Sequence, residues 1–109
     1  SSDVCSSDLG QFDIGKMNFA FADLVLKTPA AAHTLTQKEA DLLRFLCEHP
    51  NKVLKREEIL RQVWGKSDYF LGRSMDVFMA KLRKYFKDDP SVILETIHGV
   101  GFRLNATVI

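Results

Sequence analysis

This chain of 109 residues lacks the residue patterns that catalysis or metal binding would need. Its three histidines, His33, His49 and His98, lie in separate segments, and neither a His-x-x-x-His nor a Cys-x-x-Cys spacing is present. No candidate nucleophile has an obvious general base close by in the sequence. Two cysteines, Cys5 and Cys47, are too few for a disulfide scaffold, and the helical pattern around Cys47 predicts a small buried hydrophobe. We therefore expect neither an enzyme nor a bound cofactor or metal.

Long apolar runs are also missing. No segment approaches the ~18–20 apolar residues that span a bilayer, so no membrane association is expected. The first nine residues, SSDVCSSDL, lack the charged-then-apolar pattern of a signal peptide. We interpret residues 1–10 as an authentic linker or a non-native leader, and residues 11–109 as one domain. Free thiols and no secretion signal predict a cytoplasmic protein.

Charge is unevenly distributed along the chain. The formal net charge is only +1, which excludes a globally basic, histone-like binder. Residues 1–50 carry four positive and seven negative groups, whereas residues 51–109 carry eleven positive and seven negative groups. A chain polarised in this way can present a basic face to phosphate while its other end stays neutral or acidic.

The first half of the chain predicts a small sheet followed by two helices. Residues 11–27 alternate short β-favouring pieces with small or polar residues, which is typical of an antiparallel meander, and residues 33–35 are expected to add a strand. The sequence TQKE at residues 36–39 is a capping box, in which the first hydroxyl and the last carboxylate each bind the other residue's amide. This first helix should end at residues 49–51. A second helix is predicted over residues 56–64.

A third helix, predicted over residues 72–87, has two contrasting faces. At about 100° per residue, one sector of roughly 60° should face the core and contains Met75, Met79, Leu82 and Phe86. The opposite side carries Arg73, Ser74, Val77, Ala80, Lys81 and Lys84, with Phe78 and Tyr85 at its edge. Between Arg73 and Lys87 there are five positive residues and one negative residue. The helix therefore has an apolar inner face and a basic outer face.

A hairpin should follow this helix, because two β-favouring segments, residues 92–98 and 102–105, flank the sequence Gly99-Val100-Gly101. A basic helix that can lie in the DNA major groove, followed by a hairpin that can reach an adjacent groove, is the arrangement of a winged-helix protein. The sequence therefore indicates a DNA-binding module.

Four motifs in a fixed order support this interpretation. They are Leu-Thr-x-x-Glu-x-x-Leu-Leu from Leu35, Arg-Glu-x-Ile with Val-Trp-Gly from Arg56, Arg-x-x-Asp-Val with Leu-Arg-Lys from Arg73, and Thr-x-x-Gly-x-Gly-Phe-Arg-Leu from Thr96. Together they resemble the OmpR/PhoB-type effector domain of bacterial two-component response regulators over residues 11–105. The resemblance implies an α+β fold: a winged helix-turn-helix with an N-terminal antiparallel four-stranded sheet, three helices and a C-terminal β-hairpin wing.

The resemblance and the helix faces together assign a DNA-binding site. Base-facing residues are Arg73, Ser74, Val77, Phe78 and Lys81, phosphate-facing residues are Arg56, Trp64, Arg83, Lys84 and Arg103, and wing residues are Thr96, His98, Gly99 and Gly101. Several positions have a second interpretation. Phe78 could touch thymine methyl groups or pack at the helix edge, and Trp64 could belong to the core. Arg73 could pair with Asp76, and Arg83 could pair with Asp76 or Glu57.

The resemblance also implies partners. They are double-stranded DNA, RNA polymerase through the loop at residues 66–71, and an upstream receiver domain whose phosphorylation promotes dimerisation on tandem half-sites. A rival hypothesis is a winged-helix protein-interaction module without DNA binding, for which Phe78, Met79 and Tyr85 would form an apolar patch. A third is the same domain fused to a membrane sensor.

Overall fold

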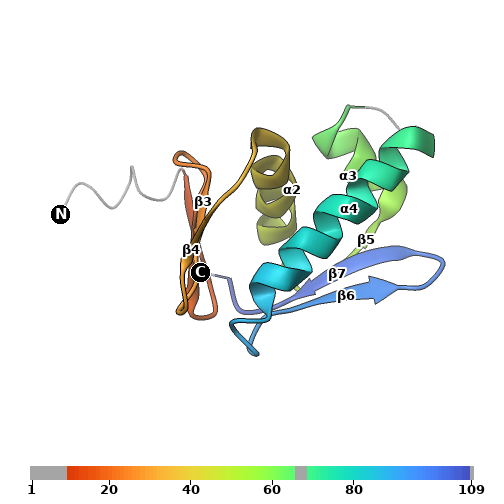
Figure 1. Cartoon of the computed structure of the whole chain (residues 1–109). Coiled ribbons are helices and arrows are strands. Elements are labelled where there is room, and N and C mark those ends of the chain that lie inside the picture. Colours follow the sequence, from red (N-terminus) through yellow and green to blue (C-terminus); the bar gives the residue numbers. More distant parts are fainter. Residues whose placement is uncertain (1–9, 66–68, 109) are drawn as a thin grey trace.

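The computed structural model describes residues 10–65 and 69–108; the leader predicted at the N-terminus lies almost entirely outside them. The fold is α+β, with two antiparallel sheets on either side of a layer of helices (Figure 1). The elements are β1 (Gln11–Ile14), β2 (Met17–Ala20), β3 (Val25–Lys27), β4 (Ala32–Thr34), α2 (Gln37–Glu48), β5 (Val53–Lys55), α3 (Arg56–Val63), α4 (Tyr69–Phe86), β6 (Ile93–Ile97) and β7 (Gly101–Asn105). The class and the three helices predicted from the sequence are confirmed.

The N-terminal sheet is the predicted meander with its fourth strand. Its strands run in the order β1-β2-β3-β4, each antiparallel to the next. Alternation along the strands turns Ile14, Phe19 and Leu26 towards the helices, where all three are fully buried. Residues after β7 come back to this sheet, where the Gly15 amide donates a hydrogen bond to the Thr107 carbonyl at 3.0 Å. The sheet is therefore tied to both halves of the domain.

Only half of the predicted capping box forms at the start of α2. The Glu39 amide donates to the Thr36 hydroxyl oxygen at 3.3 Å, as expected for an N-cap threonine. The Glu39 carboxylate does not bind the Thr36 amide. It lies instead 3.4 Å from the Lys81 ammonium of α4, and Glu39 is only 3% exposed. A tertiary partner has replaced the local one, because a buried carboxylate is stabilised more by a cation than by a neutral amide.

The helix α4 begins at Tyr69, three residues before the predicted start. Glycine is a poor helix former, costing about 1 kcal/mol relative to alanine, yet the helix runs through Gly72. Gly72 is buried inside the helix, where an added Cβ would lie 3.6 Å from a guanidinium nitrogen of Arg56. That distance is an ordinary van der Waals contact, so the contact does not explain why the helix includes Gly72. Residues 69–71 of the predicted polymerase loop are helical, and residues 66–68 lie outside the described residues.

The wing is a three-stranded sheet in the order β5-β7-β6, not the two-stranded hairpin that the sequence predicted. The extra strand, β5, pairs with β7 and leads directly into α3. Its sequence, Val-Leu-Lys, is short, and only the alternation of exposed and buried residues marks it as a strand. The turn is also shifted by one residue: His98, Gly99 and Val100 form it, and Gly101 is the first residue of β7.

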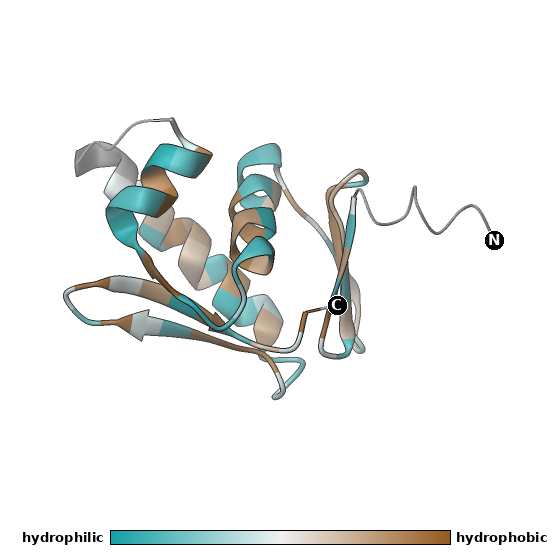
Figure 2. Cartoon of the chain, turned by 180° about the vertical axis from the view of Figure 1, so that it is seen from behind, coloured by the Kyte–Doolittle hydropathy of each residue, from teal (hydrophilic) through white to brown (hydrophobic). Residues whose placement is uncertain are grey.

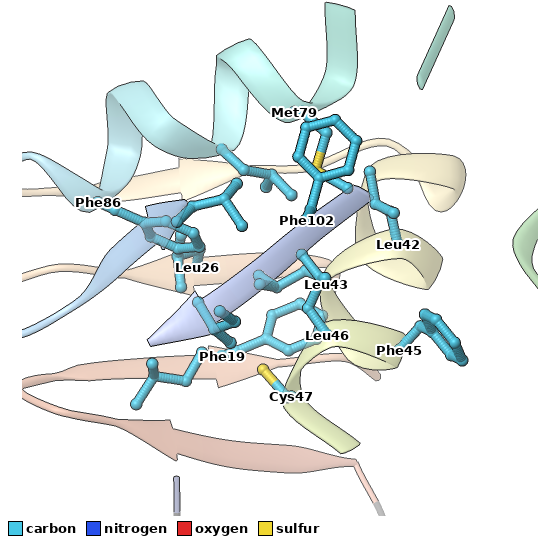
Figure 3. Packing of buried hydrophobic residues seen from close by; sticks show 14 of the residues in the cluster. Phe19, Leu26, Leu42, Leu43, Phe45, Leu46, Cys47, Met79, Phe86 and Phe102 are labelled. Atoms are coloured by element: carbon cyan, nitrogen blue, oxygen red, sulfur yellow. The ribbon is translucent and has the colours of Figure 1, made fainter. Parts of the chain in front are cut away.

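One hydrophobic core joins both sheets to the helices (Figure 3). The four residues predicted on the inner face of α4, Met75, Met79, Leu82 and Phe86, are all at most 3% exposed. Apolar segments of α2 and α4 face inward, and hydrophilic segments lie mostly on the outside (Figure 2). Cys47 belongs to this core, and burial raises the pKa of its thiol far above the ordinary range. Its prediction as a buried hydrophobe is confirmed.

Asp89 fixes the turn after α4 to the turn between β1 and β2. Its side chain accepts hydrogen bonds from the amides of Lys16 at 2.6 Å and Ser91 at 2.9 Å, and the residue is 0% exposed. Desolvation alone would raise the pKa of this carboxyl, but the amide hydrogen bonds outweigh it, so the pKa lies below its ordinary value. The ionised carboxylate therefore holds the C-terminal end of α4 against the N-terminal sheet.

Replacing Asp89 by asparagine should lower the free energy of unfolding by about 1–2 kcal/mol at neutral pH, because hydrogen bonds to a charged acceptor are the stronger ones. Since the folded-state pKa is depressed, this contribution is complete above the unfolded pKa of ~3.9 and is lost as pH falls through the folded value. Urea unfolding of both proteins over a pH series should show a constant difference above about pH 5 that narrows below about pH 4. A difference that grew with acidification would contradict this role.

Candidate nucleic-acid interface

The outer face of α4 is the most basic helical surface that the sequence predicted, and the structure keeps it in solvent. With the inner residues anchored in the core, Arg73, Val77, Ala80 and Lys84 are exposed, and Ser74 is half-buried. At about 100° per residue, Val77 and Lys84 point most directly away from the core, and Arg73 lies within about 30° of that direction. These side chains form what we call the outer stripe, defined by Arg73, Val77, Ala80 and Lys84.

Lys81 lies beside the outer stripe and already has an anionic partner. Its ammonium is 3.4 Å from the Glu39 carboxylate and 5.9 Å from the centre of the Phe78 ring. The Lys81 side chain is 52% exposed, whereas that of Glu39 is 4% exposed. The pair therefore links α4 to α2, and a DNA contact by Lys81 would compete with neutralisation of a buried carboxylate.

Phe78 and Trp64 pack on each other at the junction of α3 and α4. Their ring centroids are 5.8 Å apart, and the Lys38 ammonium lies 5.4 Å from the centre of the Trp64 ring. Both aromatic residues are partly buried and pack against the hydrophobic core. The arrangement favours packing at the helix edge for Phe78, and it favours the core interpretation of Trp64. Their contacts with bases and phosphates stay predictions.

Arg56 connects the start of α3 to α4 through Asp76. One guanidinium nitrogen lies 3.2 Å from one Asp76 oxygen, and the other donates to the second oxygen at 3.3 Å. The two side chains are 45% and 53% exposed, so the pair contributes at most about 1 kcal/mol. The acidic residue of α4 is thus neutralised by α3. Among the described residues, Asp76 pairs with Arg56 and with neither Arg73 nor Arg83. The two suggested pairings of Asp76, with Arg73 and with Arg83, were therefore wrong.

Arg83 lies at the C-terminal end of α4, outside the outer stripe. The other suggested partner, Glu57, lies 3.6 Å from Arg61 within α3, so the alternative pairing of Arg83 with Glu57 was also wrong. Arg83 instead borders an open cavity of about 230 Å³ between α4 and β6, together with Lys87 and the exposed Ile93. Its phosphate contact stays a prediction.

Some of the predicted wing residues are exposed to solvent, and others are already engaged within the three-stranded sheet. Thr96, His98 and Gly99 are exposed, at the end of β6 and in the turn. Gly99 has a φ of +77°, a conformation that favours glycine, and Gly101 meets the backbone of β5. Arg103 lies opposite Glu95 in the β6–β7 register, and its Nε donates to the carboxylate at 2.8 Å. A phosphate would have to compete with that carboxylate.

Two residues near the wing escaped the sequence analysis. Lys55 and Val100 line an open cavity of about 350 Å³ between the start of α3 and the turn, with Arg56, Glu57 and Gly99. Lys55 directly precedes α3, and its side chain makes no capping hydrogen bond. The pairing of β5 with β7 is what brings it to the wing. Because β5 was not predicted, the sequence offered no reason to place Lys55 there.

The described part of the chain contains neither a helix suited to crossing a membrane nor a group of three or more metal-ligating side chains. These findings add no site beyond the surface formed by α4 and the wing.

Comparison with known proteins places this surface in context. A family model described as "Transcriptional regulatory protein, C terminal" matches residues 30–104. The transcriptional regulatory protein RprY of Bacteroides fragilis is 42% identical over 93 residues, which are 85% of this chain and 39% of RprY. The chain thus spans well under half the length of this relative.

Solved structures with the same architecture come from two other bacteria. The DNA-binding domain of Escherichia coli CadC superposes with a TM-score of 0.79 at 25% identity, covering 92% of this chain and 95% of that domain. DrrB, a Thermotoga maritima OmpR/PhoB homologue, gives a TM-score of 0.71 at 26% identity, covering 95% of this chain and 50% of DrrB.

Proposed function

The chain belongs to the OmpR/PhoB-type family of C-terminal domains of transcriptional regulatory proteins, and from this premise we propose that it binds double-stranded DNA sequence-specifically as the output domain of a two-component response regulator. In this proposal α4 enters the major groove and the wing reaches the adjacent groove. The domain acts by binding rather than by catalysis.

The observation that carries the proposal is the outer stripe of α4. It combines Arg73 and Lys84 with the uncharged Val77 and Ala80, all exposed on one side of an 18-residue helix. At about 1.5 Å per residue the helix is roughly 27 Å long, enough to follow a groove. The acidic Asp76 is neutralised by Arg56, so it opposes phosphate less than its sequence position suggests. Cations at both ends of the stripe can reach the two phosphate backbones that border a groove.

The rival, a protein-interaction module without DNA binding, loses the apolar patch that suggested it. Met79 is 2% exposed, Phe78 packs on Trp64, and Tyr85 stacks on His33 with ring centroids 4.5 Å apart. Met79 is therefore unavailable to a partner, and Phe78 and Tyr85 are each half-buried against another aromatic ring. The basic outer stripe therefore favours DNA over a protein partner.

The remaining partners follow from the family and are part of the same proposal. A phosphorylated receiver domain would precede this domain in the full-length protein and promote dimerisation on tandem half-sites. RNA polymerase would be contacted through residues 66–71, of which residues 69–71 form the first turn of α4. The regulator would act in the bacterial cytoplasm.

Selection of binding sites from a random duplex pool tests the proposal. We expect enrichment of one sequence, and its affinity should fall steeply with salt because each neutralised phosphate contributes about −0.9 to the slope of log K against log salt concentration. Four phosphate contacts would give a slope near −3.6. Absence of enrichment together with an affinity independent of salt would favour the rival instead.

A further inference from the structure

The open cavity between the end of α4 and the start of β6 is lined mostly by apolar residues. Figure 1 shows these two elements side by side at the end of the domain away from the wing turn. Phe86, Val92 and Leu94 line the cavity and are each at most 4% exposed. Ile93 also lines it and is 52% exposed. The volume of about 230 Å³ is smaller than the ~300–1,000 Å³ of pockets that hold whole small molecules, so it suits one side chain of a larger partner.

Two cations, Arg83 and Lys87, border this cavity. Both are exposed, and among the described residues neither forms an ion pair. The acids nearest in the sequence already have other partners. Asp88 accepts a hydrogen bond from the Thr28 hydroxyl at 3.0 Å, and Asp89 accepts from backbone amides. The positive charge at the border of the cavity is therefore left without a counter-charge in the described part of the chain.

The turn that contributes to the cavity, residues 87–91, is held in place. Its buried Asp89 accepts hydrogen bonds from the amides of Lys16 and Ser91. Pro90, which lines the cavity, has a φ restricted by its ring. A site whose walls are fixed before binding loses little conformational freedom when a partner arrives. The cavity is thus a preformed site.

We propose that this cavity binds a peptide segment of a partner protein in which one large apolar side chain is flanked by carboxylates. The apolar side chain fills the cavity beside Ile93, and the carboxylates pair with Arg83 and Lys87. Charge complementarity selects an acidic segment over a basic one. The apolar lining selects a peptide over the sugar-phosphate backbone of DNA, which has no apolar side chain to place there. This site lies beside the outer stripe, so the inference goes beyond the proposed DNA binding.

Fluorescein-labelled peptide pools test the proposal. The first pool places leucine, isoleucine or phenylalanine between glutamates and aspartates, the second places the same residues between lysines, and the third places alanine between glutamates and aspartates. Fluorescence anisotropy with this chain should show the first pool binding at least about tenfold more tightly than either other pool, because the second repels the two cations and the third leaves the cavity unfilled. Added salt should weaken the binding, since it screens the ion pairs.

The variants Ile93→Ala and Lys87→Ala locate the site. Ile93→Ala should weaken binding of the first pool about fivefold, and Lys87→Ala about tenfold, because one removes apolar contact and the other a charge-assisted hydrogen bond. The matched controls are Val53→Ala and Lys52→Ala. Val53 is 47% exposed on β5, and Lys52 is an exposed cation directly before that strand. Both controls should keep the wild-type affinity, and thermal unfolding of all four variants checks that the fold is intact.

The outcomes separate this inference from the proposed function. Equal binding of the three pools, a preference for the basic pool, or binding that Ile93→Ala leaves unchanged would overturn the inference and leave DNA binding in place. Absence of peptide binding with a loss of DNA affinity in Lys87→Ala would assign the cavity border to the phosphate backbone instead. Concentration-dependent dimerisation that Ile93→Ala abolishes would make a second copy of this chain the occupant and would also overturn it. Peptide binding by a chain that selects no DNA site would overturn the proposed function alone.

Discussion

Substitution of Gly101 by alanine should destabilise this domain by about 3 kcal/mol or more. Gly101 opens β7 and pairs with Lys55 of β5 and Ile97 of β6. A Cβ at this position would lie 1.9 Å from the Leu54 carbonyl oxygen and 2.9 Å from two further backbone atoms of β5. Backbone atoms cannot rotate away as a side chain can, so β5 would have to move. Because β5 leads directly into α3, the strain would reach the core.

The matched control for Gly101→Ala is Gly99→Ala in the same wing. Gly99 has a φ of +77° and no atom within 4 Å of an added Cβ, so only conformational strain of about 1–2 kcal/mol is expected. Chemical unfolding of both variants isolates the cost of the close approach, since the substitution is identical. The melting temperature of Gly101→Ala should fall by roughly 10 °C or more below that of the wild type. Equal stability of the two variants would show that β5 does not approach Gly101 so closely.

The second large effect concerns DNA affinity. The double variant Arg73→Ala/Lys84→Ala removes both cations of the outer stripe and should weaken binding to the selected site by about 100-fold at low salt, since charge-assisted hydrogen bonds are worth about 1.5 kcal/mol or more each. If both residues neutralise phosphates, the slope of log K against log salt concentration should become shallower by about 1.8. Neither residue belongs to the core, so the free energy of unfolding should change little.

A control for this variant must lose the same charge elsewhere. Lys27→Ala/Arg44→Ala removes two positive charges from β3 and α2 rather than from α4. Long-range attraction should fall slightly in this control, but the salt slope should stay within about 0.3 of the wild type. If both double variants changed affinity and slope equally, the binding surface would not be the outer stripe, and net charge alone would explain the effect.

Local patterns accounted for most elements of the fold. The 3.6-residue period of α4 identified its four core residues, since a helix buries one face whatever it packs against. Glycine and apolar alternation identified the wing hairpin and the meander. Gly65, directly after the end of the second helix, has a φ of +85°, the left-handed conformation in which glycine commonly ends a helix. In each case the physical cause acts within a few residues, so it is visible in the sequence.

Errors arose where a distant partner competes with a local one. The strand β5 is three residues long and exists because β7 supplies its hydrogen bonds. Glu39 leaves its capping box for Lys81, 42 residues away, and Asp76 pairs with Arg56 across two helices. The helix α4 begins three residues before Gly72, although glycine is a poor helix former. No pattern within a short window contains these pairs.

The sequence by itself determined the class of fold, the family and which face of α4 meets solvent, because hydrophobic periodicity and motif order are local properties of the chain. Only the tertiary structure decided which of the predicted DNA-binding cations are already engaged. It paired Lys81, Arg56 and Arg103 with carboxylates and left Val77 at the crest of the helix. Charge pairing depends on distances between elements, and those distances are set by how the core packs.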